Sequence, residues 1–478
     1  MFFRVVSMAQ FRYQQLASFL NQQIQQGLWQ PGERLPSIRS LSQQHGLAKI
    51  SVQKALHTLE AAGLIEARSR SGYFVALRKP GPKPAAKPAE AAPSEVNVPL
   101  LFQEIMARSA AFDLCPWAPV EAPDQHLLLL NRHLSRALRQ QPSRKAAYYG
   151  DPEGLPALRE QLAARYRSRN CALGVEQIAL TSGCQNSLFL ALMACCQPGD
   201  TVAVESPAFY GVLQLLQQLG LRVVELPASP EIGIQAEDLE AAIKRWQVKV
   251  CVVTPSYATP TGAALPSEEQ KRLVALTQRY PLTIIEDDIY GDLGFHLQAE
   301  PLKRFDTQGK VILCGSFSKS LSRDLRLGWI SGGQLHSRIV QLKLINQLSG
   351  SQAVQEGLTS YLAEGHYKRH LMAMRQKLAR NRDQLLESLQ LSWQGDYTTT
   401  KPEGGLALWL QLPPGIDTKT AYRPLLQQKI VITPGSLFST TNRFDHCLRL
   451  SFSQPVTGFR RQAISTLAKT LVAGGRRG

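Results

Sequence analysis

The 478-residue sequence lacks long apolar runs and regularly spaced cysteines. None of its apolar stretches approaches the roughly 20 residues that a membrane-spanning helix needs. Its eight cysteines include no CxxC pair, which disfavours a zinc site or a disulfide framework. The apolar stretch before Met8 is too short for a signal peptide, and Met8 is an alternative start. We therefore expect a cytoplasmic chain with reduced thiols, no bound metal and no membrane contact.

Acidic side chains are also scarce. The chain has 37 Asp and Glu against 54 Lys and Arg, which gives a formal net charge of +17. The imbalance is steepest at the beginning, because residues 1–80 hold ten basic and only three acidic side chains. Such a basic segment favours an acidic partner such as nucleic acid. The length of the chain predicts more than one domain.

The N-terminal segment has the pattern of a small DNA-binding domain. Apolar spacing predicts helices over residues 11–27, 38–45 and 50–62, and Ser37 can cap the second of them. Residues 64–75 are expected to form two short strands around a basic tip. Two short helices joined by a glycine-containing turn are typical of a helix-turn-helix, to which the hairpin adds a wing. The alternative is a three-helix domain with a solvated basic face.

Residues 13–77 resemble the winged-helix domain of the GntR family. The matching residues are Pro31-Gly-Glu-Arg-Leu-Pro-Ser-Ile-Arg39, Gly46, Val52, Ala55-Leu56, Leu59, Gly63 and Gly72-Tyr-Phe-Val75. The resemblance implies that the helix from residue 50 enters the major groove of DNA. It implies DNA contacts from Arg39, Lys49, Ser51, Gln53, Arg68 and Arg70. Lys49 replaces the usual arginine, which makes a bidentate contact to guanine less favourable, so the operator sequence does not follow.

Composition divides the chain into four parts. The winged helix is expected over residues 1–77, and a linker over 78–111, whose first 22 residues hold six prolines and five alanines. Alternating strands and helices then predict a large domain over 112–365, with a mainly parallel sheet covered on both faces. A smaller α+β domain is expected over 366–478. The expected strands are 178–181, 201–205, 222–226, 249–254, 282–286, 311–315 and 326–331, and the expected helices are 184–197, 209–219, 236–245, 267–279 and 335–348.

One stretch of the large domain suggests chemistry. Lys319 follows an apolar strand, between two serines, and Arg326 lies seven residues further on. Ligands of open α/β sheets bind outside the carboxyl ends of the strands. A lysine there can form a Schiff base with a carbonyl cofactor, while hydroxyls and an arginine can hold a phosphate. Pyridoxal 5'-phosphate (PLP) needs both features. The alternative is a surface loop with ordinary basic residues.

Other strand ends add to this pattern. Ser182-Gly-Cys-Gln185 opens an expected helix, and free backbone N–H groups at a helix start favour a phosphate. Phe209 offers a ring that can stack on a pyridine or simply pack in the core. Asp287 ends another strand and can keep a pyridine nitrogen protonated. The alternative is a solvated loop acid.

Taken together, these motifs resemble the fold-type I, aspartate-aminotransferase class of PLP proteins, from about residue 113 to the end. The resemblance implies Lys319 as the Schiff-base lysine, Asp287 as the partner of the pyridine nitrogen, and Arg449 as the arginine that binds a substrate α-carboxylate. It implies Tyr290 at the ring hydroxyl and Phe209 as the ring that stacks on the pyridine. It implies that Tyr149 reaches the phosphate of a neighbouring subunit. The residues implied at the phosphate are Gly183, Cys184, Gln185, Ser316, Ser318 and Arg326. Thr259 stands where aminotransferases have asparagine, which puts efficient transamination in doubt.

The order of domains resembles the MocR subfamily of GntR regulators, in which a winged helix-turn-helix precedes an α/β PLP-dependent transferase domain of fold-type I. The resemblance implies a PLP-dependent regulator that binds DNA half-sites as a head-to-tail homodimer. It would sense PLP or an amino-acid-like effector through external aldimine formation. One alternative is an active PLP-dependent aminotransferase with an accessory DNA-binding domain. Another is a DNA-binding protein whose second domain has lost its cofactor.

Overall fold

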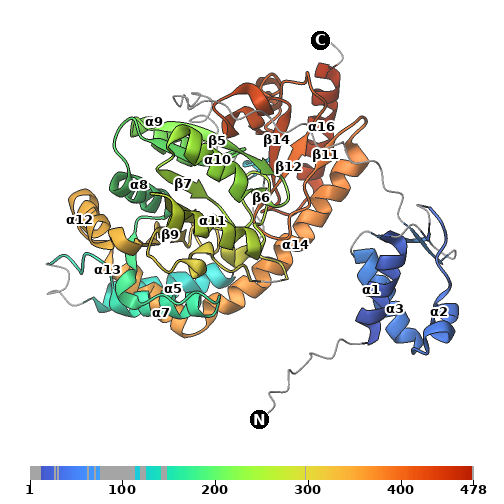
Figure 1. Cartoon of the computed structure of the whole chain (residues 1–478), viewed down its shortest axis with the longest axis horizontal. Helices are drawn as coiled ribbons and strands as arrows, with labels where there is room; N and C mark the ends of the chain where they lie inside the picture. The colour runs from blue at the N-terminus through green and yellow to red at the C-terminus, as the bar shows by residue number, and fades with distance from the viewer. Residues whose placement is uncertain are drawn as a thin grey trace. The chain divides into compact units, whose positions relative to one another are not determined.

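The computed structural model describes residues 12–25, 28–29, 32–61, 64–68, 72–75, 113–118, 125–141, 148–296 and 298–475 (Figure 1). The chain separates into two compact units, residues 1–88 and 89–478. The expected linker over 78–111 lies largely outside the described residues, as do Met8 and Arg70. Within the part that is described, no helix combines the length and apolar character needed to cross a membrane.

The first unit is a three-helix domain with a β-hairpin. Its elements are α1 (Arg12–Gln25), α2 (Ile38–His45), α3 (Lys49–Ala61) and the antiparallel pair β1 (Ile65–Arg68) and β2 (Gly72–Val75). Ser37 begins α2, because its side chain accepts a hydrogen bond from the backbone N–H of Ser40 at 3.1 Å. Gly46 ends the helix in the left-handed conformation, at φ 60°. Leu20, Val52 and other apolar side chains of all three helices form one core.

An eight-stranded mixed sheet organises the second unit, with strand order β3-β10-β9-β8-β7-β4-β5-β6. The strands from β9 to β5 run parallel, whereas β10 runs antiparallel to both β3 and β9. The strands are β3 (Ala179–Thr181), β4 (Thr201–Ser206), β5 (Arg222–Ser229), β6 (Gly233–Ile234), β7 (Val250–Val253), β8 (Thr283–Asp287), β9 (Val311–Ser316) and β10 (Gly328–Ser331).

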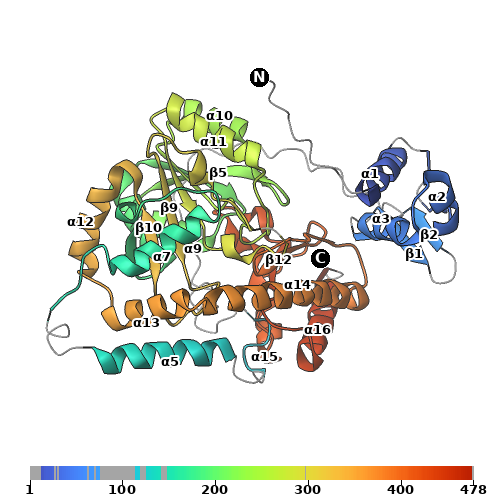
Figure 2. The ribbon, with the colours of Figure 1, turned by 90° about the horizontal axis from the view of Figure 1, so that it is seen from below.

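Helices cover both faces of this sheet (Figure 2). Val202 and Val204 of β4 pack in a cluster with α8 (Cys184–Cys195), α9 (Tyr210–Gln218) and α12 (His336–Gln347). Ala203, which points to the opposite face, packs with α10 (Ala236–Trp246) and α11 (Ser267–Arg279). This alternation explains why the strands read as continuous apolar runs, since both of their faces are buried.

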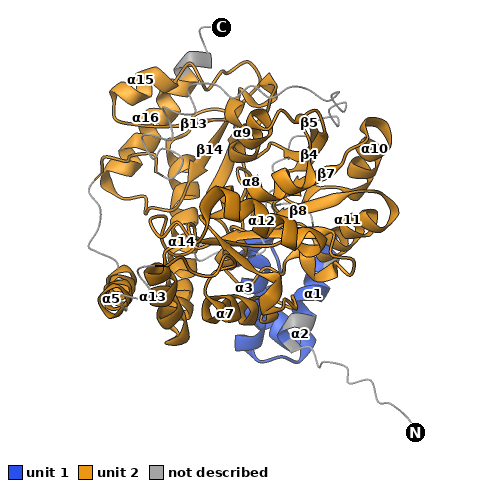
Figure 3. Cartoon of the chain, turned by 90° about the vertical axis from the view of Figure 1, so that its left-hand side faces the viewer, with its two compact units in different colours: residues 1–88 blue, residues 89–478 orange. Residues whose placement is uncertain are grey.

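A third apolar cluster joins the large sheet to the C-terminal part of the chain. Here the 27-residue helix α14 (His366–Ser392) leads into a four-stranded sheet of order β11-β12-β14-β13. The remaining elements are α5 (Gln125–Gln140), α7 (Pro156–Arg167), α13 (Gln352–Ala363), β11 (Thr398–Thr399), β12 (Ala407–Gln411), α15 (Tyr422–Gln427), β13 (Thr433–Pro434), β14 (Cys447–Ser451) and α16 (Gly458–Gly475). Figure 3 shows the two units in different colours, residues 1–88 in blue and residues 89–478 in orange.

Candidate functional site

A cavity of about 410 Å³ lies at the carboxyl ends of β4, β8 and β9. Its volume falls within the range of small-molecule sites. Residues from the starts of α8 and α9 and from the loop after β9 line it, together with Asp287 at the end of β8. The residues expected from the sequence that line this cavity are Cys184, Gln185, Phe209, Asp287, Ser318, Lys319 and Arg326.

Lys319 presents an amine in a buried and electropositive setting. Burial is the main cause that lowers the pKa of its ammonium group well below the usual value, and Arg323 and Arg449 lower it further. The neutral amine is the form that attacks a carbonyl carbon. The site therefore keeps Lys319 in its nucleophilic state.

Asp287, the last residue of β8, lines the same cavity as Lys319. The thiol of Cys184 donates a hydrogen bond to Asp287 Oδ1 at 3.0 Å. Burial raises the pKa of Asp287 to about 6, while that hydrogen bond and Lys319 oppose the increase. The carboxylate is thus mainly ionised near neutral pH and can pair with a protonated ring nitrogen.

The beginning of α8 and Arg326 form an anion site. Gly183 adopts φ 102°, and a Cβ atom there would lie 3.1 Å from Arg326 Nη2, so the close approach requires glycine. Arg326 Nη2 donates to the carbonyl of Ser182 at 2.9 Å. Ser316 Oγ donates to Ser318 Oγ at 2.8 Å beside this point. Free N–H groups of a helix start together with a guanidinium suit a phosphate.

Arg449 projects from β14 of the smaller sheet and is buried. Its Nε donates to Thr259 Oγ1 at 2.9 Å. Burial raises the pKa of the Tyr290 hydroxyl to about 12, and Arg449 and Thr259 counteract this shift. Thr259 therefore contacts the arginine expected at a substrate carboxylate as well as lying beside Tyr290. Arg449 does not line the main cavity but a small separate one, together with Asp113 and Arg460.

The structure adds residues to the cavity that sequence reasoning missed. Tyr210, Gln214 and Arg323 line the cavity. The sequence could have indicated Arg323, because it lies between Lys319 and Arg326 in the same loop. Six expected residues are not among those that line it: Tyr149, Gly183, Thr259, Tyr290, Ser316 and Arg449. Tyr149 does not line the cavity of its own chain, and its side chain is 78% exposed.

Three of the expected DNA-contacting residues lie at the start of α3. This helix begins at Lys49, one residue earlier than expected, so Lys49, Ser51 and Gln53 all lie in its first turns. Lys49, Gln53 and Arg39 of α2 are exposed, whereas Ser51 is half-buried. Arg68 is the last residue of β1, and Arg70 lies outside the described residues.

Both parts of the chain match known families. Residues 12–75 match the bacterial regulatory proteins of the gntR family, and residues 122–461 match aminotransferase class I and II. The uncharacterized HTH-type transcriptional regulators YjiR and YdcR of Escherichia coli are 37% and 33% identical to the chain. YjiR matches over 96% of this chain and 98% of its own length, and YdcR over 96% and 99%.

The chain belongs to the MocR subfamily of gntR regulators. The solved structure of kynurenine aminotransferase from Pyrococcus horikoshii, in complex with PMP, resembles this MocR-type chain with a TM-score of 0.71. That structure is 26% identical and covers 79% of this chain and 95% of its own. The second unit of the MocR-type chain thus has the fold of a PLP aminotransferase, as the sequence predicted.

Proposed function

We propose that the chain is a transcriptional regulator that binds PLP at Lys319 and changes its affinity for DNA when an amino-acid-like effector enters the same site. The observation that carries this proposal is the Lys319 amine, whose pKa is lowered by burial and which lines one cavity together with Asp287 and the start of α8. The DNA-binding half rests on the gntR match over residues 12–75.

The residues of the cavity fit PLP. When bound, PLP supplies an aldehyde that condenses with amines and a ring that accepts electrons. Asp287 would hold the ring nitrogen, Phe209 one face of the ring, and Arg326 with the first N–H groups of α8 the phosphate. Cys184 would share Asp287 with the ring nitrogen, because its thiol already donates to one carboxylate oxygen.

Two arginines define the effector side of the site. Arg449, held by Thr259, would bind an α-carboxylate in a bidentate manner. Arg323 lines the cavity, and the charges of both arginines act on Lys319. Burial lowers the pKa of Arg323, and the nearby charge of Arg449 lowers it further. A site with two guanidinium groups favours an effector with more than one anionic group, and we expect an amino acid with an acidic side chain to bind best.

For such binding to regulate DNA, the two states of the site must differ in DNA affinity. We propose that the chain acts as a head-to-tail homodimer that presents two winged helices to two operator half-sites. The exposed Tyr149 supports this arrangement, since it is suited to complete the site of a second copy rather than its own.

An active aminotransferase with an accessory DNA-binding domain is the second candidate, because Lys319, Asp287 and Tyr290 are all present. Thr259 favours the regulator, since it replaces an amide with a shorter group that is already engaged by Arg449. The production of a keto acid from the amino acid distinguishes the two functions: slow or absent turnover supports the sensor, and rapid turnover supports the enzyme.

The absorption spectrum of the full chain with PLP tests the cofactor site. We expect a band near the visible edge, its loss in Lys319→Ala, and a shift of the band when the right amino acid is added. Lys343→Met is a matched control, because Lys343 is also a buried lysine with a lowered pKa but lies on α12 outside the cavity. Equal spectra for the parent and Lys319→Ala would overturn the proposal.

A further inference from the structure

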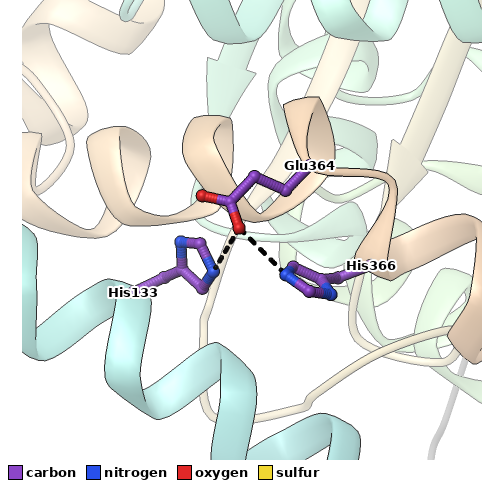
Figure 4. Close-up of side chains that lie close together, drawn as sticks. All are labelled: His133, Glu364 and His366. Carbon is purple, nitrogen blue, oxygen red and sulfur yellow. Dashed lines mark hydrogen bonds and ion pairs between the residues drawn. The ribbon is translucent and has the colours of Figure 1, made fainter.

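Three possible metal ligands that do not line the PLP cavity converge where α5 packs beside the junction of α13 and α14 (Figure 4). His133 projects from α5, Glu364 follows the last residue of α13, and His366 begins α14. Gly365 lies between the latter two at φ 72°, a left-handed turn that favours glycine. The turn brings Glu364 and His366 to the same side, facing His133.

The hydrogen bonds of His133 leave a lone pair aimed at a carboxylate. Ser360 Oγ donates to the carbonyl of Gly357 at 3.0 Å, so it accepts from His133 Nδ1 at 2.7 Å. This assignment places the proton on Nδ1 and leaves Nε2 as an acceptor. Nε2 lies 3.5 Å from Glu364 Oε2, which is also an acceptor. A cation between the two atoms would satisfy both.

The ligand atoms have the spacing of a metal site. His133 Nε2, a carboxylate oxygen of Glu364 and a ring nitrogen of His366 all lie within 4.8 Å of one another. His366 Nε2 lies 3.0 Å from the same Glu364 Oε2. Tetrahedral zinc with bonds of about 2.0–2.1 Å holds its ligand atoms about 3.3 Å apart, so small side-chain shifts suffice. Glu364 is 51% exposed, which leaves room for a water molecule as a fourth ligand.

We propose that His133, Glu364 and His366 form a binding site for a divalent transition-metal ion of the zinc class. Two imidazoles and one carboxylate with an open fourth position match the borderline ligand preference of zinc. The contact between Ser360 and His133 Nδ1 is the kind of outer hydrogen bond that orients a metal-binding imidazole. The site departs from our expectation of no metal, which rested on cysteine spacing alone.

Arg369 competes with the metal for His366. Its Nη2 donates to His366 Nδ1 at 2.7 Å, which keeps the proton of the ring on Nε2, directed at Glu364. A metal ion on Nε2 displaces this proton, and the ring then needs its N–H at Nδ1, where a guanidinium cannot accept it. Arg369 must therefore turn away before the metal binds.

A bound ion would connect α5 to the α13–α14 junction. α14 continues for 27 residues towards the smaller sheet that carries Arg449. The ion would thus stabilise the folded second unit, because it binds side chains that converge only in the native state. The expected consequence is a thermal midpoint that rises with zinc concentration.

Equilibrium dialysis of the full chain with zinc provides the test. We expect one zinc ion per chain and at least about tenfold weaker binding in His366→Ala. His296→Ala is the matched control, because His296 faces Glu403 at 3.7 Å, and no third such ligand accompanies this pair among the described residues. This control should bind zinc as the parent does.

Arg369→Gln tests the proposal through an increase in zinc affinity, which a misfolded variant would not show. We expect it to bind zinc more tightly than the parent, because the amide oxygen of glutamine can accept the Nδ1–H and no positive charge remains there. Cobalt(II) identifies the ligands: the complex should lack the intense near-ultraviolet band of thiolate coordination. Absence of stoichiometric binding, equal affinities in His366→Ala and the parent, no gain in Arg369→Gln, or a thiolate band would each overturn the proposal.

Discussion

Glu205, near the end of β4, has a carboxyl group whose pKa is strongly changed by folding. Burial raises its pKa from an ordinary value of 4.5 to about 8, although it accepts a hydrogen bond from Thr254 N–H at 3.0 Å. Between pH 4.5 and about pH 8, the folded chain therefore keeps this proton, whereas the unfolded chain has released it. Stability from this group is present below pH 4.5 and is lost as the pH rises through about 8.

Glu205→Gln should remove this dependence, because the amide is neutral at every pH and its oxygen can still accept from Thr254. Relative to the variant, we expect the parent to lose up to about 1.4 kcal/mol of stability for each pH unit within that range. Thermal midpoints of both proteins at about pH 5 and about pH 8 measure the difference. Parallel shifts in the two proteins would contradict the assignment.

Residues that follow a strand in a short motif could be identified from the sequence. Lys319, Asp287 and Gly183 each lie where a strand ends or a helix begins, and the topology brings them together. Contacts between distant side chains could not be identified. The hydrogen bond from Cys184 to Asp287 and the contact of Arg449 with Thr259 depend on side-chain directions that no local pattern encodes.

Helix α2 shows how a cap fixes an element. Ser37→Ala removes the acceptor for Ser40 N–H, which should cost about 1 kcal/mol. Since α2 packs against α3, the helix that carries Lys49 and Gln53, we expect faster amide hydrogen exchange in α2 and weaker DNA binding. Ser40→Ala is the control, because it keeps the backbone N–H that Ser37 caps. Exchange that is equally slow in Ser37→Ala and the parent would refute the role of the cap.

Elements with strong local signals were predicted closely, and others were missed. The bounds of α2 follow from Ser37 and Gly46, and those of α11 agree at both ends. Helix α5 was missed because Leu127 to Leu130 form a continuous apolar run in which Leu130 is buried and Leu128 is exposed. The two-residue strands β6 and β13 are too short to show any period. Only the folded sheet reveals that β10 runs antiparallel between β3 and β9.

The molecule as a whole joins a winged-helix unit of the gntR family to a unit with the aminotransferase fold. The basic excess of residues 1–80 and the gntR match assign DNA binding to the first unit, and the aminotransferase match assigns small-molecule binding to the second. Regulation requires that the state of the PLP site alter DNA affinity. A coupling of about 1–3 kcal/mol, or roughly 5- to 150-fold in affinity, is typical of allosteric proteins.

The most direct test measures the affinity of the full chain for an operator duplex selected by the chain itself from random DNA. Fluorescence anisotropy would compare the protein with PLP alone and with PLP plus the amino acid that shifts its spectrum, for the parent and for Lys319→Ala. If the PLP site regulates DNA binding, Kd changes at least about fivefold in the parent and not at all in Lys319→Ala. An unchanged Kd in the parent, or the same change in Lys319→Ala, would contradict this regulation.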